Sequence, residues 1–243
     1  MATSLESTSR RKAQVPVPCY FCKGPEIKWE CKDCDVRMCN SCEVKTVLDT
    51  SPMISVAIHV NKENEVIVGI GEQGPPFAVK DCSVRQVIIF DSDYKRKVTS
   101  EFDKKGIKLD SYALRIRTDF RNVVYVNDRF DNDNNGRIVA IHRNGHLQFT
   151  FDGQTYLETF KPQGITITPS NNIVVSDPSS NALHVLNSNG DLLALQLVKN
   201  DLGIQSPLSL FFDVEGYLLI GCHKGNNEDY GKFHAVKMVD SLM

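Results

Sequence analysis

A repeated pattern of short apolar strands and polar turns fills this 243-residue chain from about residue 54 onward. Four stretches share one order: a strand, a turn, a strongly apolar strand, a loop, another strand, a turn and a last strand. The second strands are expected to start at Val66, Val123, Ile173 and Tyr217, which lie 57, 50 and 44 residues apart. Because long helical periodicity is absent, the repeats predict a mainly β, antiparallel fold.

The length of the repeat reduces the number of β architectures that fit the sequence. Asn144-Gly145 and Asn189-Gly190 carry the dipeptide that favours a tight hairpin turn. A four-strand unit of about 40–50 residues is typical of a β-propeller blade. A β-sandwich also has many short strands, but it does not repeat one four-strand unit. We therefore expect a β-propeller over residues 56–243, with about four recognisable blades. Four blades could form an open arc, a smaller closed ring, or part of a longer relative's ring.

Six of the eight cysteines form three C-x2-C pairs between residues 19 and 42. The pairs are Cys19 with Cys22, Cys31 with Cys34, and Cys39 with Cys42. Such a pair can present two thiolates to one tetrahedral zinc ion. The N-terminal MATSLESTSRRKAQ has no apolar stretch typical of a secretory signal. We therefore expect a reducing, cytoplasmic location, where clustered cysteines bind metal rather than form disulfides. Reduced free thiols are the alternative.

The cysteine-rich segment is predicted to be a small zinc domain at residues 15–50, preceded by a disordered tail at residues 1–14. A segment this short cannot be stabilised by burial alone. Zinc would therefore supply most of its folding free energy. No histidine follows Cys42 until His59, which lies in an alternating, strand-like stretch and is interpreted as a strand residue.

The cysteine spacing resembles the B-box zinc finger of tripartite-motif (TRIM) proteins. In that family the first and third pairs hold one zinc, while the second pair joins two histidines around another. The resemblance implies that the first zinc is bound by Cys19, Cys22, Cys39 and Cys42. It implies that Cys31 and Cys34 form half of a second site, which Asp49 or a partner chain could complete. We expect one zinc ion and an incomplete second site.

The repeats resemble NHL repeats, most closely the third. Its matching residues are Pro162, Gly164, Asp177, Asn181 and Gly190. An NHL propeller after a B-box is an arrangement found in the TRIM family. The family's ubiquitin-ligase chemistry rests on a RING finger, but residues 1–18 contain no Cys or His. The family's coiled coil is also not expected, because only about ten residues separate Cys42 from the first strand and no heptads occur there.

Charge and composition restrict the function classes. The formal net charge of −2 excludes a strong overall positive field, and no apolar run suits a transmembrane helix. Some NHL propellers bind single-stranded RNA on a positive face. A basic patch that could do this is formed by Lys95, Arg96, Lys97, Lys104, Lys105 and Lys108. The histidines of the repeats show no spacing for a catalytic triad.

These observations favour a zinc-binding, non-catalytic scaffold of TRIM-NHL type, whose propeller loops contact a protein partner. RNA binding in post-transcriptional regulation is the first alternative. A role in ubiquitin ligation, implied only by the resemblance, is the second. A calcium-dependent six-bladed hydrolase is a distant fourth possibility. Open blade edges would favour self-association.

Overall fold

The computed structural model describes residues 48–75, 77, 83–101, 108, 112–154, 157, 159–223 and 231–238, with the backbone of residues 29–30 and 37–38. The chain divides into two compact units, Met1–Asp49 and Thr50–Met243. In the first unit, β1 (Trp29–Glu30) pairs antiparallel with β2 (Arg37–Met38). The predicted zinc ligands of this unit lie outside the described residues.

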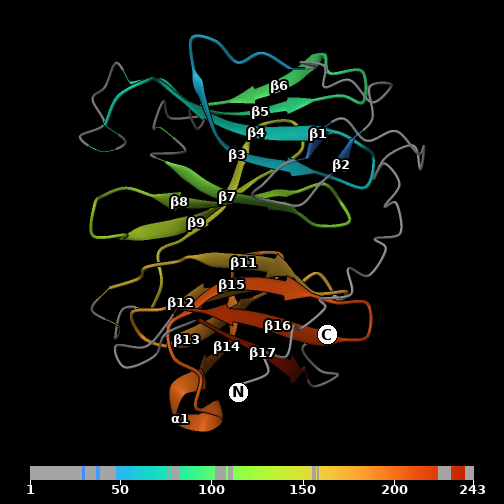
Figure 1. The fold of residues 1–243 in the computed structure, drawn as a ribbon. Coiled ribbons are helices and arrows are strands. Elements are labelled where there is room, and N and C mark those ends of the chain that lie inside the picture. The colour runs from blue at the N-terminus through green and yellow to red at the C-terminus, as the bar shows by residue number, and fades with distance from the viewer. Residues whose placement is uncertain are drawn as a thin grey trace, which may run out of the picture. The chain divides into compact units, whose positions relative to one another are not determined.

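The second unit consists of antiparallel sheets that follow one another in chain order, here called blades 1 to 4 (Figure 1). Blade 1 contains β3 (Ile54–Val60), β4 (Val66–Gly71), β5 (Arg85–Phe90) and β6 (Arg96–Ser100). Blade 2 contains β7 (Ala113–Thr118), β8 (Val124–Arg129), β9 (Gly136–Ile141) and β10 (Leu147–Phe151). Blade 3 contains β11 (Gly164–Ile167), β12 (Ile173–Asp177), β13 (Ala182–Leu186) and β14 (Leu192–Leu197). Blade 4 contains β15 (Pro207–Phe212), β16 (Tyr217–Cys222) and β17 (Lys232–Lys237), and the short helix α1 (Val198–Leu202) joins it to blade 3.

The middle strands of the blades are the most buried. Every residue of β4, β12 and β13 is buried, whereas the outer strands β6 and β10 alternate between exposed and covered positions. The buried strands are rich in Val and Ile, whose branched side chains suit a strand covered on both faces. The predicted mainly β fold is therefore confirmed, with its core between sheets rather than on one side of a single sheet.

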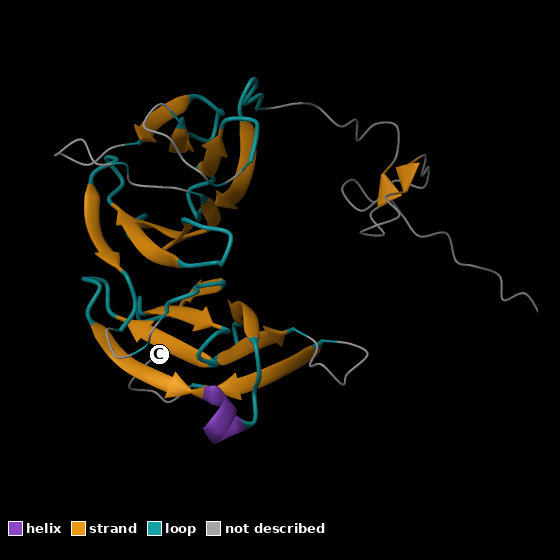
Figure 2. Ribbon diagram, turned by 90° about the vertical axis from the view of Figure 1, so that its left-hand side faces the viewer, coloured by secondary structure: helices purple, strands orange, loops and turns teal. Residues whose placement is uncertain are grey.

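Three clusters of buried side chains join consecutive blades. Ile67 belongs to the cluster between blades 1 and 2, Tyr125 to that between blades 2 and 3, and Leu218 to that between blades 3 and 4. Within the described ranges, no such cluster joins blade 4 to blade 1. Figure 1 shows blade 1 at the top of the view, blade 2 below it and blades 3 and 4 at the bottom, and Figure 2, turned by 90°, shows α1 at the lower end. Each of these three interfaces between neighbouring blades is thus an apolar contact between two sheet faces.

Within the described residues, seven hairpin turns share a frame of five residues. The N–H of the first residue donates to the carbonyl of the fifth, and the N–H of the fourth donates to the carbonyl of the first. The first residues are Asn61, Asp91, Asp119, His142, Thr168, Asn187 and Asp213. The fourth residues, with φ from 60° to 90°, are Asn64, Tyr94, Asn122, Gly145, Asn171, Gly190 and Gly216. Both predicted Asn-Gly turns are confirmed, but each loop is one residue longer than the two-residue hairpin.

Side chains hold most of these turns in shape. In five of them, the Oδ1 atom of the first residue accepts hydrogen bonds from the backbone N–H groups of the third and fifth residues, at 2.8–3.1 Å. The five acceptors are Asn61, Asp91, Asp119, Asn187 and Asp213. Asn and Asp therefore recur in the repeats because they satisfy backbone donors that the turn leaves unpaired.

Candidate interaction surface

The seven turns gather at one end of the blades, here called the turn face (residues 61–65, 91–95, 119–123, 142–146, 168–172, 187–191 and 213–217). Hydrogen bonds connect turns of different blades. Asn61 Nδ2 donates to Asn122 Oδ1 at 3.1 Å, and the Phe120 N–H donates to Asn171 Oδ1 at 3.5 Å. At the start of β10, next to its turn, Gln148 Nε2 donates to the carbonyl of Ser188 in the β13–β14 turn at 2.9 Å. Hydrogen bonds thus hold the backbone of each turn in shape, and further hydrogen bonds hold the turns of blades 1, 2 and 3 in position relative to one another.

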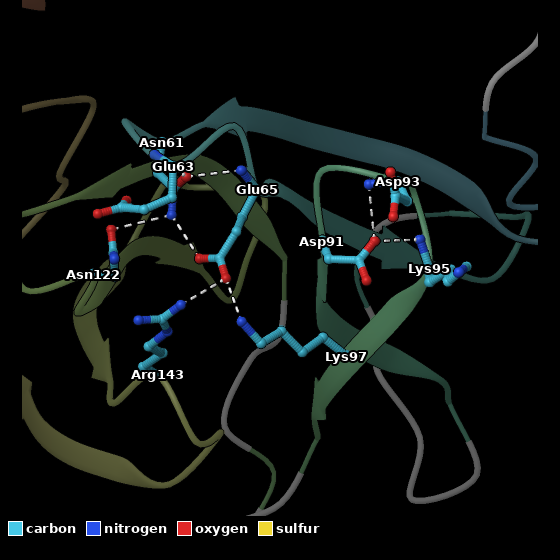
Figure 3. A network of polar contacts seen from close by, with 9 residues as sticks. All are labelled: Asn61, Glu63, Glu65, Asp91, Asp93, Lys95, Lys97, Asn122 and Arg143. Carbon is cyan, nitrogen blue, oxygen red and sulfur yellow. Dashed lines mark hydrogen bonds and ion pairs between the residues drawn. The ribbon is translucent and has the colours of Figure 1, made fainter.

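A buried carboxylate ties blade 1 to blade 2 at this face (Figure 3). Glu65 is 4% exposed. Its Oε1 accepts from Lys97 Nζ at 2.5 Å and from Arg143 Nη2 at 2.9 Å, and its Oε2 accepts from Asn61 Nδ2 at 2.8 Å. Lys97 comes from β6, whereas Arg143 comes from the β9–β10 turn of blade 2. Because all donors meet one carboxylate, the network acts as an electrostatic clamp between the blades.

Opposing effects set the pKa of Glu65. Burial raises the pKa, but hydrogen bonds from Lys97, Asn61 and Arg143 outweigh burial and lower it below the ordinary value of 4.5. The native state therefore holds the charged carboxylate more strongly than the unfolded chain does. The stability that this provides is complete above pH 4.5 and is lost as the pH falls through the native pKa.

We expect Glu65→Gln to lower the free energy of unfolding by ~1–3 kcal/mol at neutral pH, because two cations lose their carboxylate. The variant should also lose less stability than the wild type when the pH is lowered, because glutamine cannot be protonated as Glu65 is. Urea unfolding at about pH 7 and about pH 4 tests both effects. Glu63→Gln is the matched control, because Glu63 is exposed and only its backbone N–H bonds to Asn61. Equal losses of unfolding free energy in the two variants would contradict the conclusion that the Glu65 network stabilises the contact between blades 1 and 2.

Large apolar side chains project from the turn face. Tyr94 is 43% exposed, Phe120 is 57% exposed and Val214 is fully exposed. The Arg121 guanidinium lies 5.3 Å from the centroid of the Phe120 ring. Aromatic and arginine side chains are the groups that most often dominate protein–protein binding energy. A partner could therefore bury them without any rearrangement of the turns.

Two described residues of the predicted RNA-binding patch contact other groups of the chain. Lys97 forms the ion pair with Glu65, and Lys108 Nζ donates to the Ser83 carbonyl. Lys95 and Arg96 are exposed. The two other members of the patch, Lys104 and Lys105, lie outside the described residues. Of the four described residues of the patch, Lys97 and Lys108 thus contact groups of this chain, while Lys95 and Arg96 are exposed.

Among the described cysteines and histidines, Cys222, His223 and His234 line one small pocket at blade 4, whereas His59 lies in β3 of blade 1. Cys222 in β16 is a free thiol, and burial raises its pKa despite nearby Lys232. His59 is confirmed as a strand residue of β3, where its Nε2 atom hydrogen-bonds with Thr118 Oγ1 at 2.9 Å. Burial, with a contribution from Arg117, lowers the pKa of His59 to about 4. In the part of the chain that the structure describes, no group of three or more acidic, Cys or His residues suits a metal ion.

One close His–Asp pair was not anticipated from the sequence. His184 Nε2 lies 3.9 Å from Asp177 Oδ2, and both side chains are 0% exposed. Phe151 and Phe160 pack edge-on against the His184 ring. Asp177 also accepts hydrogen bonds from the Ser179 and Ser180 hydroxyls, which shapes the turn after β12. Because no substrate can reach it, this pair belongs to the interior of the blade 2–blade 3 interface.

Comparison with known proteins gives a fold rather than a family. No family model matches the sequence, and no curated protein matches it. A Bacteroides caccae protein of unknown function superposes with a TM-score of 0.54 at 11% identity, covering 78% of this chain and 65% of its own. The fold is β-propeller-like.

A second solved structure agrees. It is an inactive virginiamycin B lyase from Staphylococcus aureus with quinupristin, with a TM-score of 0.51 and 15% identity. The match covers 81% of this chain and 60% of the lyase chain. This chain therefore spans less than two thirds of the length of both structures. No helix in the described ranges is long and apolar enough to cross a membrane.

Proposed function

We propose that this protein is a non-catalytic scaffold that presents the turn face of its propeller-like unit to a protein partner. The observation that carries the proposal is the exposed Phe120 on a turn whose backbone is held by Asp119 and Asn171. A preorganised turn loses little conformational entropy when a partner binds. Tyr94 and Val214 are exposed on other turns of the same face.

We expect Phe120→Ala to weaken binding of the partner by about tenfold or more, since aromatic anchors contribute strongly to interfaces. The partner is first isolated by affinity capture with the wild-type protein, and each variant is then titrated against it by calorimetry. Phe130→Ala is the matched control, because Phe130 is 43% exposed on the β8–β9 loop, at the opposite ends of the strands. A larger loss from Phe130→Ala than from Phe120→Ala would place the contact elsewhere.

We also propose that the N-terminal unit is a B-box-type zinc finger, as the cysteine spacing suggests. Its first zinc would be held by Cys19, Cys22, Cys39 and Cys42, with Cys31 and Cys34 as half of a second site. The strands β1 and β2 support this proposal because they pair on either side of Cys31 and Cys34 in the sequence. A C-x2-C pair between two short antiparallel strands is a common setting for structural zinc.

The alternatives have less support. RNA binding would need the basic patch, of which Lys97 is engaged by Glu65. Ubiquitin ligation rests on the resemblance to TRIM proteins alone. The cytoplasmic location that we propose rests on the clustered cysteines, which suit a reducing compartment. The protein-binding scaffold is preferred because it uses side chains that are both exposed and held in place.

A further inference from the structure

Blade 4 differs from the other blades at its outer edge. In blades 1 to 3, a fourth strand pairs with the third: β6 with β5, β10 with β9 and β14 with β13. In blade 4, β17 pairs with β16, and no further strand is found beside it within the described residues. The outer edge of β17 therefore corresponds to the edge that the fourth strand covers in each of the other three blades.

An apolar cleft of about 210 Å³ lies next to this edge. Its lining includes Leu183 and Val185 of β13, Ala194 of β14, Leu202 of α1, and Leu218 and Val236 of blade 4. These residues belong to, or border, the apolar interface between blades 3 and 4. The cleft is thus an extension of an established interface rather than an isolated surface hollow.

The complete blades show what would fill such a space. In blades 2 and 3, the fourth strand contributes an apolar side chain to the interface with the preceding blade. Leu147 of β10 packs against the cluster between blades 1 and 2, and Leu192 of β14 packs against that between blades 2 and 3. The cleft lies in the interface between blade 4 and its preceding blade 3. At blade 4, the matching side chain of a fourth strand would point into the cleft.

We propose that the edge of β17 and the adjacent cleft bind one extended peptide of a partner protein, which completes blade 4 as its fourth strand. The peptide backbone pairs with β17 as β10 pairs with β9, and an apolar side chain near the start of the peptide strand enters the cleft, as Leu147 of β10 enters the interface with blade 1. Main-chain hydrogen bonds provide affinity in such strand addition, and the side-chain pockets provide selectivity. The site adjoins the turn face at Tyr217, which pairs with Lys237 of β17, but the proposal does not depend on binding at the turn face.

A second copy of this chain fits the edge less well. If the β17 strands of two copies paired antiparallel, the copies would be related by a two-fold axis perpendicular to the joined sheet. Such an axis leaves the same face of the sheet pointing the same way in both copies. Blade 3 of each copy would therefore lie on the same face of the joined sheet. That face already has β14 and α1 at the cleft, as Ala194 and Leu202 show. The two copies of blade 3 would therefore collide above it. A single strand brings no second blade with it.

The test uses the full chain and a fluorescent peptide that copies residues 146–153, HLQFTFDG, which include β10. We expect saturable binding of one peptide per chain by fluorescence anisotropy, and slower hydrogen exchange of β17 amides in the complex. A peptide with proline in place of Phe149 should not bind, because proline cannot donate to the ladder. Leu202→Glu should weaken binding by about tenfold or more, because it places a charge at the cleft.

Leu193→Glu is the matched control. Leu193 is 48% exposed and lies on β14 away from the cleft lining, whereas Leu202 is 47% exposed and lines the cleft. Both substitutions are at accessible positions, so both variants should fold, and circular dichroism checks this. Equal binding by Leu202→Glu and wild type, or by the proline peptide, would overturn the proposal. Protection of the β17 amides from hydrogen exchange without peptide would also overturn it. In a monomer, such protection would mean that this chain's own residues cover the edge; in a dimer seen by sedimentation equilibrium, a second copy would cover it.

Discussion

The variant Leu186→Ala is expected to lower the free energy of unfolding by ~2–5 kcal/mol. Leu186 is 0% exposed in β13 and belongs to the cluster that joins blades 2 and 3. Tyr125, Ile138 and Ile165 are members of the same cluster, and all are at most 1% exposed. The strands around Leu186 are held by ladders on both sides, so they cannot collapse into the space that the substitution leaves. The loss therefore includes a cavity cost as well as lost burial.

Urea unfolding followed by circular dichroism measures this effect. Leu193→Ala on the neighbouring strand is the control, because Leu193 is 48% exposed and its truncation leaves no internal cavity. We expect the control to stay within ~0.5 kcal/mol of the wild type. If Leu186→Ala costs no more than Leu193→Ala, the blade 2–blade 3 cluster does not contribute to stability as described.

Removal of zinc is expected to unfold residues 15–50 while leaving the blades folded. A structural zinc site contributes an apparent ~10–16 kcal/mol to the folding of a small domain, which is more than burial in so short a segment can supply. The chain divides into compact units between residues 49 and 50. We therefore expect a chelator to make the N-terminal unit sensitive to protease without changing the strand signal of the blades.

Metal analysis and limited proteolysis before and after chelation test this prediction. The purified chain should contain one zinc ion, and Cys19→Ser should abolish it. Cys222→Ser is the control, because Cys222 lies in β16 of blade 4 and should not affect metal content. Unchanged protease resistance of residues 15–50 after complete loss of metal would show that zinc does not stabilise this segment.

The strand pattern was accessible from the sequence because its signals are local. Val66, Ile173 and Tyr217 begin β4, β12 and β16 as predicted, and β8 begins at Val124, one residue after the predicted start. Apolar runs and Asn, Asp or Gly turns act over a few residues, so one sequence suffices to locate them. The precise turn type was not accessible, because Asn-Gly is compatible with more than one loop length.

The contacts between blades could not be predicted in the same way. Glu65 and Arg143 are 78 residues apart, and nothing in the spacing of either repeat indicates that they meet. Lys97 was assigned to a basic patch because charge was counted along the chain, whereas the fold places its ammonium group on Glu65. His184 and Asp177 likewise come together only when β12 pairs with β13.

The shared turn frame has a consequence for how this protein can acquire new binding preferences. The frame is held by the backbone, by the side chain of its first residue and by the positive φ of its fourth. In the β7–β8 turn, the second and third residues are Phe120 and Arg121, and neither side chain is needed to close the turn. These two positions, and the matching Val214 and Glu215 of the β15–β16 turn, can therefore vary in identity while the loop length stays constant. Selectivity could evolve here by substitution alone, and a combinatorial library randomised at these positions would sample it on one unchanged backbone.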